Sequence, residues 1–316
     1  MKKVVISILA LAVIIAGPSQ FGCGDRGKDM DKSKPETVRD AVVAGKFYPK
    51  DPQALREMIE GFYSKTPDIP LGSNMIGAVC PHAGYVYSGP VASYVFKNLP
   101  KDVFDTVIIL FPSHYKRFRG VLALDVDAYA TPLGNVKIDR DLTRKLIDAD
   151  PAIFYGEGVY EREHSMEVML PFLQVSLGDD FKLVALMMGD QTPNMARRLA
   201  GDIETVVGDR RVLVIASTDM SHYHPYETAN ALDSRALTHM INLDDLALIN
   251  DLRGGKTELC GYGPTLTLMH LAKSKGAKRG KVLKHANSGD TQGGKEKVVG
   301  YCSVAFFSKK RGREIK

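Results

Sequence analysis

The chain has 316 residues, of which 44% are hydrophobic and 25% are charged, a composition typical of a globular protein with a sizeable core. The net charge is +5, but Lys2 and Lys3 supply two of these charges and the tail 309–316 supplies four, so the remainder sums to −1. A nucleic-acid-binding protein carries its basic excess on the folded body. We therefore expect no nucleic-acid partner.

Residues 1–22 have the pattern of a bacterial secretory signal peptide. Two lysines precede an apolar run over residues 4–16, which is short for a membrane-spanning helix, and small residues follow it. Cys23 stands where a lipobox would end, although Gln20 replaces the usual leucine. We expect an exported lipoprotein, anchored outside the cytoplasm only through lipid on Cys23. Ordinary signal cleavage is the alternative. The polar stretch 23–36 would be a flexible tether.

The cysteines do not form a disulfide framework. If Cys23 carries lipid, Cys80, Cys260 and Cys302 remain, and an odd number cannot all pair. One free thiol in an oxidising compartment suggests a protected role such as metal ligation. Cys80 and Cys302 lie on expected strands, so we place them in the core.

Residues 37–308 alternate short Val- and Ile-rich runs with helical patterns. This alternation predicts a single α/β domain with a largely parallel central sheet flanked by helices, whose site lies beyond the carboxyl ends of the strands. Pro171 should kink or end its helix. The expected strands cover 75–80, 106–111, 120–124, 182–187, 211–216, 281–285 and 298–306. The expected helices cover 52–63, 89–98, 139–148, 166–175, 193–206, 227–240 and 264–273.

Three histidines, His82, His114 and His222, each follow a different expected strand. Because the ends of parallel strands meet at one edge of a sheet, we expect the three imidazoles to share a cleft. Neutral imidazole is the commonest nitrogen ligand for iron, copper and zinc, so the sequence predicts a transition-metal site. Cys260 precedes the helix 264–273, whose free amides would stabilise the thiolate form that binds metal.

Several ordered motifs between residues 41 and 307 resemble the signature of the Memo family. They are 81–89 (PHAGYVYSG), 112–114 (PSH), 163–165 (EHS) with Glu167 and 170–171 (LP), 217–222 (STDMSH), 260–261 (CG) and 287–290 (NSGD). Bacterial members of this family are often called AmmeMemoRadiSam system protein B. That name implies a functional association with AMMECR-like and radical SAM proteins.

The resemblance implies a fold like that of the LigB-like class III extradiol dioxygenases, which hold non-haem Fe(II) with two histidines and a carboxylate. In the Memo pattern a cysteine replaces the carboxylate. His82, His114 and Cys260 then match the metal ligands, and His222 matches the acid/base histidine, with Asp219 beside it. A thiolate is softer than a carboxylate, so iron or copper is the expected metal, and zinc stays possible.

These implications favour a metal-dependent oxidoreductase of unknown substrate, in which His222 moves protons and Asp219 orients its imidazole. Two alternatives stay open. One is a non-catalytic protein that binds a peptide or handles metal in the same cleft, and the other is a zinc-dependent hydrolase. The ligand would be an unidentified small molecule or peptide. His164 either lies near the cleft or caps the helix that follows it.

Overall fold

The structure, a computed structural model, describes residues 36–156 and 160–309. Its described strands form two sheets. The small sheet contains β1 (Val38–Arg39), β5 (Ala128–Thr131) and β6 (Gly134–Lys137). The large sheet contains β2 (Met75–Cys80), β3 (Thr106–Pro112), β4 (Val121–Ala123), β7 (Ile153–Tyr155), β8 (Lys182–Met188), β9 (Val212–Ser217), β10 (His222–His224), β11 (Gly280–Asn287) and β12 (Val298–Phe307).

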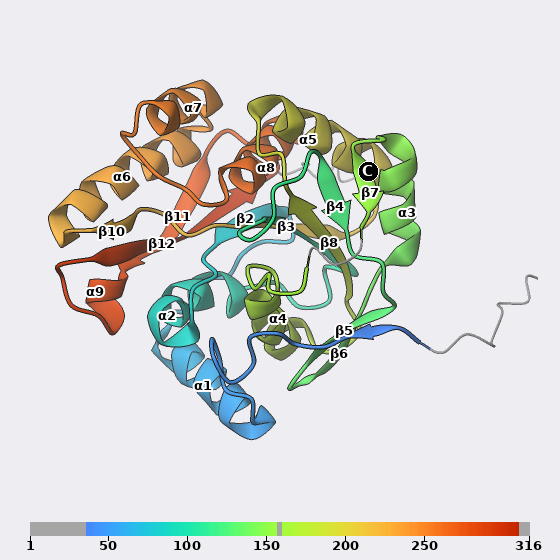
Figure 1. Ribbon diagram of the computed structural model, residues 1–316, viewed down its shortest axis with the longest axis horizontal. Coiled ribbons are helices and arrows are strands. Elements are labelled where there is room, and N and C mark those ends of the chain that lie inside the picture. Colours follow the sequence, from blue (N-terminus) through green and yellow to red (C-terminus); the bar gives the residue numbers. More distant parts are fainter. Residues whose placement is uncertain (1–35, 157–159, 310–316) are drawn as a thin grey trace, which may run out of the picture. The chain divides into compact units, whose positions relative to one another are not determined.

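The large sheet has the strand order β10-β12-β2-β9-β3-β8-β4-β7, with β11 paired to β12 (Figure 1). Its central strands β2, β9, β3 and β8 run parallel, whereas β12 and β4 flank them in the antiparallel direction. The expected fold, a single α/β domain with a largely parallel central sheet, is therefore confirmed, with antiparallel strands towards both edges.

Helices cover both faces of this sheet (Figure 1). Helices α1, α2 and α4 pack on one face, and α3, α5, α6, α7 and α8 pack on the other. The described helices are α1 (Pro52–Lys65), α2 (Tyr85–Phe96), α3 (Arg140–Ala149), the 3-10 turn η1 (Glu167–Met169), α4 (Leu170–Leu177), α5 (Pro193–Val207), α6 (Tyr226–Asn242), α7 (Asp245–Arg253), α8 (Tyr262–Ser274) and α9 (Ser288–Thr291).

Strand β3 shows why the central strands have continuous apolar sequences. Val107, Ile109 and Phe111 pack with the helices on one face, and Ile108 and Leu110 pack with those on the other. All five are fully buried. Side chains alternate between the faces of a strand, so a strand covered on both faces must be apolar at every position.

Several described helices differ from the expectation, among them the short α9, which was not expected. Helix α2 begins at Tyr85, four residues early, and Pro90 lies inside it. The expected helix 166–175 is divided into η1 and α4, with Pro171 in the first turn of α4, where its missing N–H costs nothing. Helix α7 was not expected, although Asp244 caps it by accepting a hydrogen bond from the Ala247 amide at 3.0 Å.

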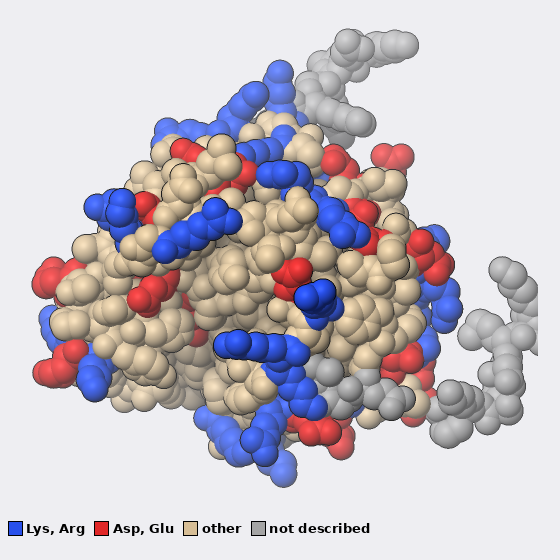
Figure 2. All heavy atoms as spheres, turned by 45° about the horizontal axis from the view of Figure 1, so that its top comes forward, with Lys and Arg blue, Asp and Glu red and all other residues tan. Residues whose placement is uncertain are grey.

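The expected signal peptide and nearly all of the tether lie outside the described residues, as does most of the basic tail. Within 36–156 and 160–309, no helix combines the length and the apolar character needed to cross a membrane. Basic and acidic side chains are interleaved over the face of the molecule in Figure 2.

A buried carboxylate in η1 joins the amino-terminal segment to the small sheet. Glu167 is fully buried, and its Oε1 accepts hydrogen bonds from the Val43 amide at 2.9 Å and the Tyr48 hydroxyl at 2.6 Å. Its Oε2 accepts from the Val42 amide at 2.8 Å and the Tyr129 hydroxyl at 2.6 Å. Four donors on one carboxylate compensate for its desolvation.

We expect Glu167→Ala to lower the free energy of unfolding by about 3–5 kcal/mol, because it leaves four buried donors without an acceptor. Urea denaturation followed by circular dichroism measures the loss. Glu60→Ala is the control, since Glu60 is exposed on α1 and should change stability by less than about 0.5 kcal/mol. Equal stabilities of the two variants would contradict this role for Glu167.

Candidate metal centre

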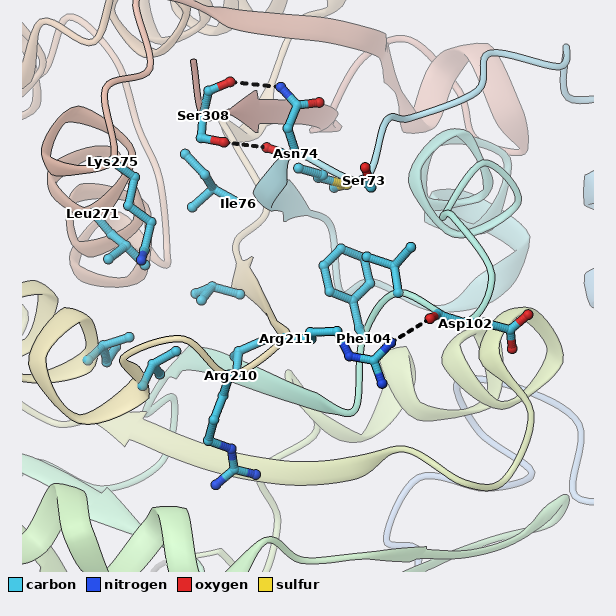
Figure 3. Close-up of a pocket in the computed structure, with 16 residues that line it drawn as sticks. Ser73, Asn74, Ile76, Asp102, Phe104, Arg210, Arg211, Leu271, Lys275 and Ser308 are labelled. Atoms are coloured by element: carbon cyan, nitrogen blue, oxygen red, sulfur yellow. Dashed lines mark hydrogen bonds between the residues drawn. The ribbon is translucent and has the colours of Figure 1, made fainter. Parts of the chain in front are cut away.

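The two ends of the central sheet differ in chemistry. At the amino ends of β2 and β9 lies a cavity of about 440 Å³ with a mainly apolar lining (Figure 3). Its two arginines are already engaged, Arg210 by Asp139 and Arg211 by Asp105. The carboxyl ends of the same strands carry His82, after β2, and Asp219, after β9. The residues that the sequence singled out for a metal site therefore lie at the carboxyl end of the sheet.

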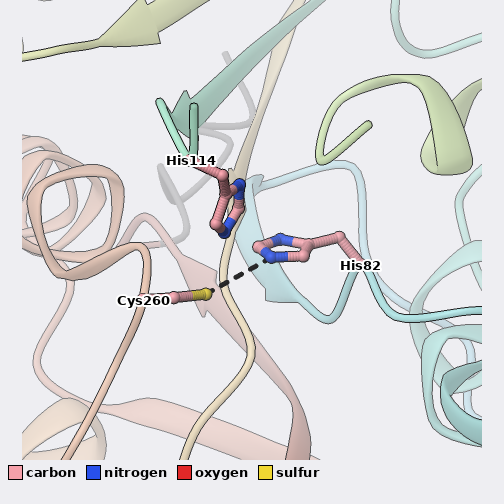
Figure 4. Close-up of side chains that lie close together, drawn as sticks. All are labelled: His82, His114 and Cys260. Atoms are coloured by element: carbon pink, nitrogen blue, oxygen red, sulfur yellow. Dashed lines mark hydrogen bonds between the residues drawn. The ribbon is translucent and has the colours of Figure 1, made fainter. Parts of the chain in front are cut away.

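His82, His114 and Cys260 come together at this end from three distant parts of the chain (Figure 4). One ligand atom from each lies within 4.8 Å of the other two, an arrangement that can hold a metal ion. Cys260 Sγ is 3.3 Å from His82 Nε2, and the rings of His82 and His114 meet edge to face with centroids 5.1 Å apart.

Hydrogen bonds fix the tautomer of His82. The Ser217 hydroxyl donates its single proton to the Ser165 carbonyl at 2.6 Å, and His82 Nδ1 lies 2.7 Å from the same hydroxyl oxygen. Nδ1 must therefore carry the proton and donate it to Ser217. This leaves the Nε2 lone pair directed at Cys260. Burial, with smaller contributions from the neighbouring histidines, lowers the pKa of His82, so its imidazole stays neutral.

Glu163 orients His114 in the same way. Its carboxylate accepts the His114 amide at 2.8 Å and His114 Nδ1 at 3.0 Å. Burial opposes ionisation of Glu163, but hydrogen bonds from His114 and Ser165, together with the nearby His114 ring, lower its pKa to about 2. An ionised carboxylate only accepts, so His114 Nδ1 donates to it, and Nε2 is the nitrogen left to face a metal.

Cys260 is held by a close contact between two loops. The Asp219 amide lies 3.2 Å from Cys260 Sγ, and the Gly261 amide donates to Thr218 Oγ1 at 2.8 Å. A Cβ on residue 261 would lie 2.1 Å from the Ser217 carbonyl oxygen. Only glycine permits this approach. Gly261 therefore lets the loop bring the neighbouring Cys260 thiol against the end of β9.

Backbone amides favour the Cys260 thiolate as expected, but in the metal-free protein other effects outweigh them. Burial and then the nearby Asp219 carboxyl raise the pKa of Cys260 to about 12, although amides of Asp219 and Gly261 oppose the rise. The thiol is therefore neutral and donates to the His82 lone pair. Cys80 and Cys302 are fully buried free thiols, so their placement in the core is confirmed.

Asp219 and His222 both line the cleft, but they are not paired as expected. Asp219 Oδ1 accepts the His82 amide at 2.8 Å, and Oδ2 lies 3.7 Å from His82 Nε2. His222 begins β10, and its amide donates to Glu258 at 3.0 Å. Burial raises the pKa of Asp219 to about 7 and lowers that of His222. Two groups able to hold a proton thus flank His82.

The cleft, of about 420 Å³, also contains residues that the sequence did not single out. Phe47, Tyr223 and Tyr301 form part of its wall. Tyr223 is 70% exposed and has a left-handed backbone, with φ of 61°, which is uncommon for a non-glycine residue. His164 lines the cleft, which was one of the two positions that the sequence left open for it. These aromatic residues lack a sequence signal because isolated tyrosines and phenylalanines cannot be told apart from ordinary packing or surface residues.

His164 stacks on His114, with ring centroids 5.0 Å apart and an interplanar angle of 27°. His114, Glu163 and His164 form a second group with metal-ligand spacing. However, Glu163 Oε1 already accepts from His114 Nδ1, from both the amide and the hydroxyl of Ser165, and from the His164 amide. Because this oxygen already accepts four hydrogen bonds, Glu163 is better suited to orient His114 than to bind a second metal ion.

Residues 39–305 match the family of Memo-like proteins. A MEMO1 family protein of Desulfurococcus amylolyticus is 37% identical over 281 residues, covering 85% of this chain and 99% of the relative. Another, of Saccharolobus islandicus, is 40% identical over 280 residues, covering 84% and 98%. The uncharacterized Escherichia coli K12 protein JW3007 shares the fold at a TM-score of 0.52 and 14% identity, covering 73% of this chain and 99% of that chain. The chain thus belongs to the Memo-like protein family.

Proposed function

We propose that this chain is a metal-dependent oxidoreductase that binds iron or copper through His82 Nε2, His114 Nε2 and the Cys260 thiolate. The observation that carries the proposal is the convergence of these three atoms. Two neutral imidazoles and one soft anionic donor fit a transition metal. Hydrogen bonding at both Nδ1 atoms leaves the two Nε2 atoms as the nitrogens that face the metal, so the set fits without rearrangement of its supports.

The metal would supply redox chemistry, and the protein would supply orientation and protons. Ser217 and Glu163 would hold the two imidazoles in the binding tautomer. The Cys260 proton, now shared with His82, would leave when a cation binds. Asp219 and His222 would hold or move protons at the wall of the cleft, because burial brings the Asp219 pKa to about 7 and keeps His222 neutral.

We expect Cys260→Ser to weaken metal binding by at least about tenfold, because a neutral hydroxyl replaces an anionic soft donor. Wild-type protein should also release about one proton per metal at neutral pH, and the variant should not. Competition titration with a chelator and proton-release measurements test both. Cys302→Ala, which removes a core thiol, should keep wild-type affinity and proton release. Equal metal affinity in Cys260→Ser and wild-type protein would remove Cys260 from the ligand set.

A second prediction separates proton transfer from metal binding. His222→Ala should keep near-normal iron or copper content, whereas His82→Ala should lose it, because we place only His82 among the ligands. Oxygen consumption by the loaded protein with ascorbate as reductant should fall about 100-fold or more in His222→Ala. Elemental analysis and an oxygen electrode measure the two quantities. Metal loss in His222→Ala equal to that in His82→Ala would instead make His222 a ligand.

We also propose that the protein acts outside the cytoplasm, anchored by lipid on Cys23. The support is the sequence alone: a charged start, a short apolar run and small residues before Cys23. The family name favours AMMECR-like and radical SAM proteins as functional associates, and the cleft would take a small molecule or a peptide.

Native protein purified from membranes should begin at a diacylglyceryl-modified Cys23, as read by mass spectrometry of the N-terminal peptide. Cys23→Ser should move the protein from the membrane to the soluble fraction, because no acyl chains remain to insert in the bilayer. A mature chain that keeps Met1, or one that starts upstream of Cys23, contradicts the anchor.

A further inference from the structure

A glutamine that follows β8 holds the backbone of the loop that carries Cys260. Gln191 Nε2 donates to the Cys260 carbonyl at 3.0 Å, and Gln191 Oε1 accepts the Gly263 amide at 2.9 Å. A backbone amide only donates and a backbone carbonyl only accepts, so the two ends of the side-chain amide are not interchangeable. Gln191 therefore spans the segment 260–263 with one hydrogen bond at each end.

The same side chain caps helix α8 from outside the helix. The N-cap of α8 is Gly261, which has no side chain to accept a hydrogen bond from the amides of the first turn. Gln191 accepts one of these amides, that of Gly263, instead. A Cβ on residue 263 would lie 2.9 Å from both Cα and Cβ of Gln191, closer than carbon atoms pack. The start of α8 and the glutamine are therefore in direct contact.

Hydrogen bonds also fix the backbone around Gln191. The Thr192 amide donates to Asp190 Oδ1 at 2.9 Å, and Thr192 is the N-cap of α5, where its hydroxyl accepts the Met195 amide at 3.3 Å. The turn between β8 and α5 is thus held on both sides of the glutamine. Gln191 can act as a fixed support for the loop because its own backbone is already ordered.

The loop has a second support on the side of β9. There the Cys260 amide donates to the Asp219 carbonyl at 3.3 Å, and the Gly261 amide donates to Thr218 Oγ1 at 2.8 Å. Residue 260 therefore lies between contacts from the ends of two strands, β8 and β9. Without Gln191, the Asp219 carbonyl is the described hydrogen-bond partner that remains for the Cys260 backbone.

We propose that Gln191 is a positioning residue of the metal centre, which holds the Cys260 thiol in its ligating position before a metal binds. The inference rests on the metal centre proposed above. Both polar atoms of the Gln191 side chain are engaged by the loop backbone, so Gln191 acts through Cys260 and not on the metal. A loop that also samples other positions binds more weakly, in proportion to the time it spends away from the binding position.

The test uses the full chain titrated with cobalt(II). The sulfur-to-cobalt absorption band reports the thiolate directly, and competition with a chelator gives the Kd for cobalt. Gln191→Glu is nearly isosteric, but it places a carboxylate oxygen against the Cys260 carbonyl where a donor stood. Gln191→Leu removes both hydrogen bonds without adding charge. Each variant should raise the Kd about three- to thirtyfold, because the loop is no longer held in place before binding.

Gln174→Glu is the matched control. Gln174 makes the same kinds of contact on the β5–β6 hairpin of the small sheet, where it accepts the Thr131 hydroxyl at 2.6 Å and donates to the Gly134 carbonyl at 3.2 Å. This variant should unfold at a lower temperature, yet its Kd should change less than about twofold. An equal rise in Kd for the Gln174 and Gln191 variants overturns the proposal. A wild-type Kd in a folded Gln191 variant, or a failure of both Gln191 variants to fold, overturns it as well.

A double-mutant cycle tests whether Gln191 acts through the thiol. In the Cys260→Ser background, the addition of Gln191→Leu should change the cobalt Kd less than about twofold, whereas an equal rise in both backgrounds overturns the proposal. Wild-type protein that binds no cobalt, or binds it without the thiolate band, overturns the proposed function together with this inference. Wild-type protein with thiolate-bound cobalt and an unchanged Kd in the Gln191 variants overturns this inference alone.

Discussion

The site depends on the close packing of the Cys260-Gly261 loop against the end of β9. Gly261 lies so near the Ser217 carbonyl that any side chain would collide with it. The contact brings the thiol to the Asp219 amide and to His82. Ser217 serves both sides of this contact, because its carbonyl limits residue 261 and its hydroxyl orients His82. One strand end thus positions two of the proposed ligands.

Around this contact, burial disfavours the charged forms of His82, Cys260 and Asp219 before a cation binds. Burial lowers the pKa of His82, raises that of Cys260 to about 12 and raises that of Asp219 to about 7. Glu163 is the exception, because its donors outweigh its desolvation. In such an interior a metal ion would be bound chiefly by the thiolate that forms when Cys260 loses its proton. This proton loss would couple metal affinity to pH.

Several parts of the fold were predictable because their signals are local. The apolar runs of β2, β3, β8 and β9 identified the central strands, since a strand buried on both faces has no polar position to interrupt it. Helix α7 was missed although Asp244, an aspartate of the type that commonly caps helices, precedes its first residue. The short strands β5, β6, β7 and β10 were missed, because three or four residues carry too little periodicity to distinguish a strand from a loop.

The sequence by itself determined the α/β class and the identities of the residues that meet at the carboxyl edge. The class and the three histidines follow from hydrophobic periodicity and from motifs that immediately follow strands, whereas Cys260 became a ligand through the resemblance to the Memo family. Only the tertiary structure decided the pairings. Asp219 contacts His82 rather than His222, Glu163 rather than another carboxylate holds His114, and Tyr301 faces the cleft. These contacts join residues 49 to 137 positions apart in the chain, and side-chain packing across such separations leaves no periodic trace in the sequence.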